Sequence, residues 1–321
     1  MEYARLGSSG MKVSRVCLGT MQFGNDSSWM LEIEAARPIM KRALDLGINF
    51  FDVANSYSAG RSEEIVGELL KDVRDDIVLA TKVRSVVGKG VNDSGLSRYH
   101  IMREVEKSLK RLQTDRIDLY QIHRWDYETP IAETLIALDD LVRSGKVRYI
   151  GASSMFAWQF AKALYNSDLL GISRFVSMQD HYNLAYREEE REMLPLCKDQ
   201  NIAVIPFSPM ARGFLSGKYK RGETASTARY KGDRLLPERF FRPEDFDVAE
   251  RTEQVAKEKG VTPSQIALAW LWHRGITAPI IGATKIEHIE EAVAAVDVKL
   301  SSDDMKRLEE PYKLHPIIAH N

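Results

Sequence analysis

The feature that most constrains the fold is a regular alternation of short apolar runs with longer amphipathic segments. This alternation predicts a parallel β-sheet whose strands are joined by right-handed helical crossovers. Runs such as IVLATK, IDLYQIH and IAVIPF are almost continuously apolar, which is typical of strands buried on both faces. The expected strands cover residues 16–19, 48–52, 77–82, 117–123, 147–153, 175–179, 202–207 and 279–282.

Segments with helical periodicity separate these runs. The expected helices cover residues 33–46, 62–70, 98–111, 130–144, 155–165, 188–198, 247–259, 263–273 and 286–296. Eight strand–helix units are the number that closes a (β/α)8 TIM barrel, so we expect an α/β fold of this type. A doubly wound sheet would carry a G-x-G-x-x-G turn after an early strand, and this pattern does not occur in the sequence.

Three further segments complete the expected architecture, in which residues 1–321 form a single barrel domain. Residues 2–15 contain a GSSGM turn between two short extended pieces, which predicts a β-hairpin that plugs the bottom of the barrel. Residues 209–246 form the longest stretch outside the repeat, and loops of this length are usually functional or disordered. A C-terminal tail follows the last expected helix.

The composition of the chain limits the partners that the protein can be expected to bind and the compartment in which it is expected. The 45 Lys and Arg residues nearly balance the 46 Asp and Glu residues, so no net field attracts nucleic acid or an anionic membrane. We find no signal-peptide pattern and no apolar run of about 18 residues. Cys17 and Cys197 lie in apolar segments, which predicts buried free thiols. We expect a cytoplasmic protein without a metal, nucleic-acid or membrane partner, and the sequence leaves its oligomeric state open.

Polar residues stand at the ends of the expected strands, where (β/α)8 barrels place their active sites. Asp52 ends the second strand with Tyr57 just beyond it, Lys82 ends the third and His123 ends the fourth. Each has an ordinary explanation alone, since a lysine can extend to solvent and a histidine can be a satisfied core residue. Their occurrence at one level on consecutive strands is harder to obtain from packing and indicates an active site.

The chain resembles the aldo-keto reductase superfamily over essentially its whole length. The segments that carry the resemblance are LGTMQFG (18–24), GINFFDVANSYSAGRSEEIVG (47–67), ATK (80–82), DLYQIHRWD (118–126), RYIGASS (148–154), MQDHYNL (178–184) and PFSPMARGFLSGKY (206–219). The combination of D-x4-Y with the later Lys and His is highly specific. The long loop after strand seven is similar to that of the branch with aryl-alcohol-dehydrogenase-like reductases and potassium-channel β subunits.

The resemblance implies an NADPH-dependent enzyme that reduces aldehydes or ketones to alcohols through Asp52, Tyr57, Lys82 and His123. Tyr57 would be the general acid. A phenol has a reference pKa of about 10, and the neighbouring ammonium of Lys82 would make its proton easier to release. Asp52 would compensate the buried charge of Lys82, and His123 would donate a hydrogen bond to the carbonyl oxygen.

The resemblance also implies a cofactor-binding set. Ser153, Ser154 and Gln179 would hold the nicotinamide carboxamide, and Phe207 would stack on its ring. A helix N-terminus near the adenosine end favours the 2′-phosphate. The other expected contacts are Gly19, Thr20 and Met21 in the first strand, Ser208, Met210, Arg212 and Lys218 in the long loop, and Gly282, Thr284, Lys285, His288 and Glu291 near the last helix.

Two departures from the family pattern concern the choice of cofactor. Relatives often carry Arg or Gln where this chain has His288, and Asn where it has Ala292. A third departure is Ser154, where many relatives have Asn, so that contact with the carboxamide would be shorter or water-mediated. NADPH remains the favoured cofactor, and some use of NADH is compatible with these residues.

The expected substrate pocket includes Phe23, Trp29, Arg124 and Trp125, and its aromatic lining suits aryl or medium aliphatic aldehydes. Arg124 either binds an anionic group of the substrate or pairs with an acidic neighbour, and the sequence leaves both open. Two other functions stay open. One is an NADPH-binding, redox-linked partner module with slow turnover, and the other, least favoured, is a barrel lyase or isomerase with a phosphate site.

Overall fold

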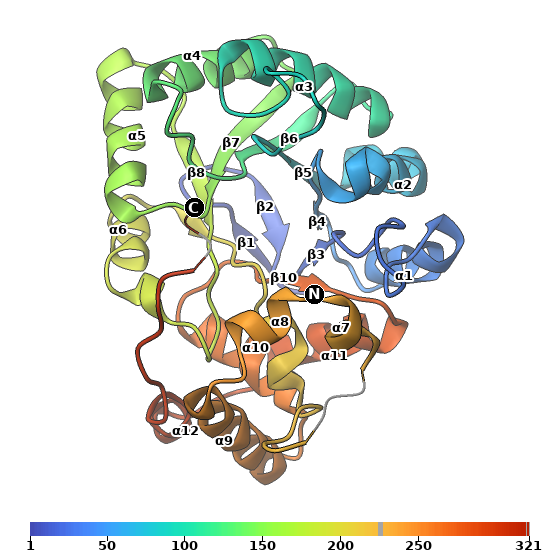
Figure 1. The fold of residues 1–321 in the computed structure, drawn as a ribbon, viewed down its shortest axis with the longest axis vertical. Coiled ribbons are helices and arrows are strands. Elements are labelled where there is room, and N and C mark those ends of the chain that lie inside the picture. Colours follow the sequence, from blue (N-terminus) through green and yellow to red (C-terminus); the bar gives the residue numbers. More distant parts are fainter. Residues whose placement is uncertain (224–226, 319, 321) are drawn as a thin grey trace.

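A computed structural model describes residues 1–223, 227–318 and 320. Helices surround a central parallel sheet, and the ribbon colours follow the chain from strand to strand (Figure 1). The sheet strands are β3 (Cys17–Gly19), β4 (Phe50–Asp52), β5 (Val78–Val83), β6 (Ile117–Ile122), β7 (Val147–Ser153), β8 (Phe175–Gln179), β9 (Ala203–Val204) and β10 (Ile280–Gly282). The helices are α1 (Ile33–Asp45), α2 (Arg61–Leu70), α3 (Arg98–Arg111), α4 (Ile131–Arg143), α5 (Ala157–Leu170), α6 (Met193–Asp199), α7 (Ala228–Gly232), α8 (Leu235–Arg239), α9 (Pro243–Lys259), α10 (Pro263–His273), α11 (Ile286–Ala294) and α12 (Ser302–Glu309).

The sheet is parallel and closes on itself. Its order is β10-β3-β4-β5-β6-β7-β8-β9. The two ends meet where Phe207, just after β9, forms a parallel bridge with Ile280 of β10. The Ile280 N–H donates to the Pro206 carbonyl at 2.9 Å, and the Thr277 N–H donates to the Val204 carbonyl at 3.0 Å. The predicted (β/α)8 TIM barrel is therefore confirmed.

Side-chain alternation along the strands fills the barrel in layers. Phe50 of β4 and Ala80 of β5 belong to one buried apolar cluster inside the barrel. Side chains two positions apart on a strand share a face, so Asp52 and Lys82 point into the same interior one layer higher. A second, larger apolar cluster includes residues from both the strands and the surrounding helices.

The N-terminal hairpin closes the bottom of the barrel, as predicted. Strands β1 (Tyr3–Arg5) and β2 (Lys12–Ser14) pair antiparallel, and Leu6 and Val13 belong to the interior apolar cluster. The turn needs glycine at Gly7, where φ is +59° and a Cβ would lie 2.3 Å from the Val176 carbonyl oxygen.

A bulge in β8 changes the direction in which the following side chains point. Ile150 pairs with Phe175, but the next residue of β7, Gly151, pairs with Ser177, so Val176 is an extra residue on β8. A bulge of this kind turns the strand and changes which residues face inward. It directs Gln179 into the barrel, where its amide reaches Asp52.

The segment 209–246 is more structured than the loop that the sequence predicts. It contains the 3₁₀ helix η4 (Ala211–Ser216), the short helices α7 and α8, and the start of α9. An aromatic cluster holds it together, with the Phe214 ring 5.2 Å from that of Phe241 and 5.1 Å from that of Phe246. Residues 224–226 of this segment lie outside the described residues.

Several predicted boundaries are wrong. The helix expected over 155–165 runs from 157 to 170, and the strand expected over 202–207 is reduced to Ala203–Val204. The helix expected over 188–198 is divided into a 3₁₀ turn, η3 (Glu188–Glu190), and α6, and the helix expected from 247 begins at Pro243. Proline suits the first turn of a helix, so Pro243 marks that earlier start.

Cys17 and Cys197 are buried and unpaired, as predicted. Across the described residues, no helix has both the length and the apolar character needed to cross a membrane.

Candidate active site

The four residues expected to form a tetrad lie together at the C-terminal ends of the strands. Asp52 ends β4, Lys82 lies near the end of β5, His123 follows β6, and Tyr57 begins the 3₁₀ helix η1 (Tyr57–Gly60). The rings of Tyr57 and His123 meet edge to face with centroids 5.9 Å apart. Ser58 continues this turn with a left-handed φ of 47°, a backbone conformation that is uncommon for serine.

Lys82 is the centre of the group and is completely buried. Its Nζ donates to Asp52 Oδ2 at 2.5 Å, to the Val53 carbonyl at 2.9 Å and to the Tyr57 hydroxyl at 3.2 Å. Burial alone would lower the pKa of Lys82, but the charge of Asp52 and the neighbouring Tyr57 hydroxyl oppose this effect, and the pKa is raised. The ammonium therefore stays charged at neutral pH while touching the phenol oxygen.

Two glutamines hold the other oxygen of the Asp52 carboxylate. Asp52 Oδ1 accepts hydrogen bonds from Gln121 Nε2 at 2.9 Å and from Gln179 Nε2 at 3.0 Å. Gly151 makes room for this layer, because a Cβ there would lie 3.0 Å from Gln121 Cγ. The amides fix the carboxylate so that its second oxygen faces Lys82.

His123 is held by its Nδ1 atom, which lies 3.2 Å from the Ser85 hydroxyl. Burial, and then the nearby charges of Lys82 and Arg124, hold the pKa of His123 well below its usual value. The imidazole is therefore neutral at neutral pH. A serine hydroxyl that donates to Nδ1 leaves the ring proton on Nε2, where it can be donated to a ligand.

Phe207, the expected nicotinamide-stacking residue, rests on a column of rings. His181 is nearly parallel to Phe207 with centroids 5.1 Å apart, and Tyr186 is nearly parallel to His181 at 4.5 Å. Burial, followed by the charge of Arg239, lowers the pKa of His181 well below its usual value. A neutral imidazole can pack in such a column without burying a charge.

The expected carboxamide-binding residues gather beside this column. The Ser153 hydroxyl donates to the Gln179 carbonyl at 2.9 Å and lies 3.3 Å from the Ser154 hydroxyl. Ser154 has a left-handed φ of 45°. The side-chain nitrogen of Gln179 bonds to Asp52 and, at 3.1 Å, to Gln121, so its amide also connects the carboxamide group of residues to the tetrad.

The expected cofactor contacts of the first strand, Gly19, Thr20 and Met21, lie at the same end of the barrel. Thr20 is buried, and both its N–H and its hydroxyl donate to the Asp52 carbonyl, at 2.9 and 3.0 Å. Gly19 lies in the strand pair with Asp52, and Met21 is half-buried at the strand end.

The expected adenosine-end residues come together from two distant segments. Burial, followed by the charge of Lys218, lowers the pKa of His288, and Lys285 lowers it further. The Thr284 N–H lies 3.4 Å from His288 Nδ1, in the turn after Gly282 and before α11. The carboxylate of Glu291 accepts a hydrogen bond from the Thr262 hydroxyl. Three basic side chains thus surround the start of α11.

The expected cofactor contacts in the long loop are partly occupied by other protein groups. Arg212 forms an ion pair with buried Asp233, with Nη2 2.6 Å from Oδ2. Ser208 and Met210 are half-buried, and the Ser208 carbonyl accepts a hydrogen bond from Asn183 Nδ2 at 3.0 Å.

The four expected substrate-pocket residues do not share one environment. Phe23 is fully buried in the apolar core, and Trp125 is nearly buried, with its ring 6.4 Å from that of Trp158 on α5. Trp29 reaches the long segment, since a Cβ at Gly232 would lie 2.7 Å from its ring. Arg124 lies at the tetrad, where its Nη1 donates to the His123 carbonyl at 2.7 Å.

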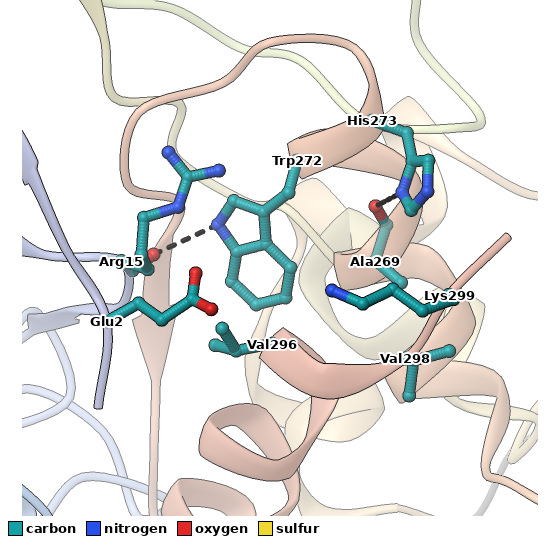
Figure 2. Close-up of a pocket in the computed structure, with 8 residues that line it drawn as sticks. All are labelled: Glu2, Arg15, Ala269, Trp272, His273, Val296, Val298 and Lys299. Carbon is teal, nitrogen blue, oxygen red and sulfur yellow. Dashed lines mark hydrogen bonds between the residues drawn. The ribbon is translucent and has the colours of Figure 1, made fainter.

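A separate pocket of about 210 Å³ lies near the N-terminal ends of the strands. Figure 2 shows its lining residues, among them Trp272, whose indole N–H donates to the Arg15 carbonyl at 3.1 Å. Arg15 precedes β3, so this pocket is at the other end of the barrel from the tetrad and is not the candidate active site.

Four residues of the site are not expected from the sequence: Gln121, Ser85, His181 and Tyr186. Gln121 was open to prediction, because it is two residues before His123 and therefore shares its strand face. The ring column had no comparable signal, because stacking depends on how the loops after β8 and β9 meet.

Known proteins match nearly the whole length of the chain. The model of the aldo/keto reductase family matches residues 15–313. Versiconal hemiacetal acetate reductase of Aspergillus parasiticus is 41% identical, and the match covers 98% of this chain and 99% of that protein. Putative aryl-alcohol dehydrogenases of Schizosaccharomyces pombe and Saccharomyces cerevisiae are 42% and 40% identical, each with 98% of this chain and 97% of the relative covered.

Proposed function

The chain belongs to the aldo/keto reductase family and is an oxidoreductase, and from this premise we propose that it reduces aldehydes or ketones to alcohols with NADPH, with Tyr57 as the general acid. The observation that carries the proposal is the position of Lys82 Nζ, which contacts both the Asp52 carboxylate and the Tyr57 hydroxyl. A buried ammonium beside a phenol is what a tyrosine needs in order to release a proton near neutral pH.

The residues fit a dinucleotide with a 2′-phosphate. Phe207 offers a supported ring for stacking at one end. Lys218, Lys285 and His288 gather at the start of α11 at the other, where free backbone N–H groups also favour an anion. When bound, the reduced nicotinamide supplies the hydride that adds to the carbonyl carbon.

The chain's own residues supply the proton. As negative charge develops on the carbonyl oxygen, Tyr57 transfers its hydroxyl proton to that oxygen. Lys82, 3.2 Å away, stabilises the resulting phenolate. The Asp52 carboxylate keeps the ammonium in place, and the amides of Gln121 and Gln179 keep the carboxylate in place.

His123 orients the carbonyl group in this proposal. Its neutral ring, held at Nδ1 by Ser85, donates from Nε2 to the same oxygen that Tyr57 protonates. A fixed donor aimed at developing charge lowers the barrier without reorganisation during the reaction.

The test is an absorbance assay of NADPH oxidation with aryl, aliphatic, dicarbonyl and phosphorylated aldehydes. We expect aldehyde-dependent oxidation that Tyr57→Phe reduces by at least about 100-fold, since general acid catalysis contributes 10²–10⁴-fold. Cofactor affinity should remain close to that of the unmodified enzyme. Near-normal turnover in Tyr57→Phe would exclude Tyr57 as the acid, and tight NADPH binding without turnover of any aldehyde would contradict the reductase assignment.

The proposal includes a reducing compartment, the cytoplasm. Two buried free thiols support it, since cytoplasmic proteins keep such cysteines reduced. Cell fractionation with an antibody against the chain tests this location.

A further inference from the structure

From the surroundings of Arg124 we infer that the substrates are carbonyl compounds that carry a carboxylate or a phosphate group. The inference rests on the proposed reductase function and specifies its substrate class. Nη1 of Arg124 lies 2.7 Å from the His123 carbonyl and 3.4 Å from the Ser153 hydroxyl, and Cζ lies 5.7 Å from the centre of the Phe207 ring.

This guanidinium has no anionic partner. Within residues 1–223, 227–318 and 320, Arg124 forms no ion pair, and its hydrogen bonds are the two to neutral oxygens given above. Burial lowers the pKa of Arg124 to about 10, so the side chain is still a cation at neutral pH. A half-buried cation without a counter-ion is costly, and an anionic ligand would remove that cost.

One acidic residue, Asp180, raises the pKa of Arg124, but in the described part of the chain the two side chains form no ion pair. Asp180 is fully buried, and neither of its carboxyl oxygens has a hydrogen-bond partner among the described residues. Burial, and then the charge of Glu189, raise the pKa of Asp180 well above its usual value. A carboxyl group with a raised pKa has less tendency to carry the negative charge that would compensate Arg124.

Two further guanidinium groups add to the positive field. Arg239 of α8 and Arg84, which follows β5, each lower the pKa of Arg124. Like Arg124, they form no ion pair with any residue for which the structure gives a position. Three arginines, from the ends of β5 and β6 and from α8, thus carry positive charge near the place where the substrate carbonyl would meet Tyr57 and His123. Such a field attracts anionic substrates.

The position of Arg124 suits binding of the substrate better than binding of the cofactor phosphates. It directly follows His123, and Tyr57 is the group that contributes most to raising its pKa. The basic residues suited to the 2′-phosphate are instead at α11. In the present structure Arg124 lies against Phe207 and Ser153, both expected nicotinamide contacts, so the side chain would turn away from them when the nicotinamide binds, with an anion as its new partner.

The experiment compares matched aldehydes that differ in charge. One pair is 4-carboxybenzaldehyde with 4-methylbenzaldehyde, and the other is glyceraldehyde 3-phosphate with glyceraldehyde. We expect the enzyme to prefer at least one charged member, and which pair shows the preference distinguishes carboxylate from phosphate. Arg124→Met should lower kcat/KM for that charged member about 10- to 100-fold, the range for losing hydrogen bonds to a charged group, and should lower the charged-to-neutral ratio accordingly.

Arg124→Lys should restore part of the ratio, because it keeps the charge but not the bidentate geometry. Arg148→Met is the matched control, since Arg148 is an exposed arginine near the start of β7, at the other end of the barrel, and it should leave the ratio unchanged. An unchanged ratio in Arg124→Met would overturn the inference. So would a loss confined to NADPH affinity, which would assign Arg124 to the nicotinamide site.

A binding measurement separates this inference from the proposed function. Benzoate, an unreactive anion, should bind the NADP⁺-loaded protein and quench its tryptophan fluorescence, with affinity at least about 10-fold weaker in Arg124→Met. If no aldehyde is turned over but benzoate binding depends on Arg124, the reductase proposal fails and the anion site stands. If aldehydes are reduced but charge and Arg124 have no effect, the anion site fails alone.

Discussion

Nζ of Lys82 lies 2.5 Å from Oδ2 of Asp52, and the two side chains are 0% and 4% exposed. A pair this deeply buried is held by mutual attraction that must offset a large desolvation cost. The protein adds the Val53 carbonyl and the Tyr57 hydroxyl on the lysine side. On the carboxylate side it adds two glutamine amides. In the proposed mechanism, the ammonium that assists proton release from Tyr57 therefore depends on the Asp52 carboxylate.

Asp52→Asn tests that dependence. The substitution keeps the shape but leaves the Lys82 ammonium buried without an anion, so we expect the free energy of unfolding to fall by about 3–5 kcal/mol. The pKa of Lys82 should fall as well, because the largest interaction that raises it is lost. Urea unfolding monitored by tryptophan fluorescence measures the first effect, and the pH dependence of kcat reports the second.

The double variant Asp52→Asn with Lys82→Met is the control for this pair. Removing both charges should recover much of the stability lost in Asp52→Asn alone. Additive losses in the double variant would show that the two side chains stabilise the fold independently and are not energetically coupled.

The stability of the protein should fall as the pH drops below about 6.5, and His123 should contribute to that fall. Its pKa in the folded protein is well below the usual value because of burial and then the charges of Lys82 and Arg124. Between about pH 6.5 and the lower folded-state pKa, the imidazole of His123 is protonated in the unfolded chain and neutral in the folded protein. Each such histidine then costs up to about 1.4 kcal/mol per pH unit.

Urea unfolding at pH 7.5, 6.5 and 5.5 tests whether the free energy of unfolding falls as the pH drops. We expect His123→Gln to flatten the dependence of unfolding free energy on pH, whatever its stability at pH 7.5. His181, which is buried and has a lowered pKa as well, should retain its own contribution in that variant. Parallel pH curves for the two proteins would mean that His123 titrates normally in the folded state.

Much of the architecture could be predicted because it depends on local periodicity. Alternation along β4 and β5 places Asp52 and Lys82 on the same inward face as Phe50 and Ala80. The helix α12 could also have been predicted, since Ser301 and Asp304 form a capping box at its start.

Other parts of the site depend on irregular geometry that periodicity does not encode. Counting alternate residues from Phe175, which packs in the outer core, would direct Gln179 outward as well. The extra residue in β8 reverses that direction, and only the family resemblance assigned Gln179 to the site. The pairing of Arg212 with Asp233 joins residues in a segment without repeat, so no periodicity predicts it.

The ring column beneath Phe207 should contribute to cofactor binding. His181→Ala removes the ring stacked on Phe207 at 5.1 Å, and we expect NADPH affinity to weaken about 2- to 12-fold, the range for one aromatic pair. His181→Phe keeps a flat ring in the column and should retain most of the affinity. Fluorescence titration with NADPH measures both variants. Equal loss in the two would point to the imidazole nitrogens instead of the stack.

Lys285 should determine part of the preference for NADPH over NADH. Its ammonium lies near Lys218 and His288 at the start of α11, where a 2′-phosphate would find both positive charge and helix N–H groups. Lys285→Met should weaken NADPH binding about 10-fold, since a charge-assisted hydrogen bond at a partly solvated site contributes near the low end of its range. NADH affinity should change little, because NADH has no 2′-phosphate. Lys162→Met, on the exposed face of α5 and far from α11 (Figure 1), should change neither affinity. A parallel loss for NADH would instead place Lys285 on the pyrophosphate or the ribose, and an unchanged NADPH affinity would assign the discrimination to Lys218 and His288.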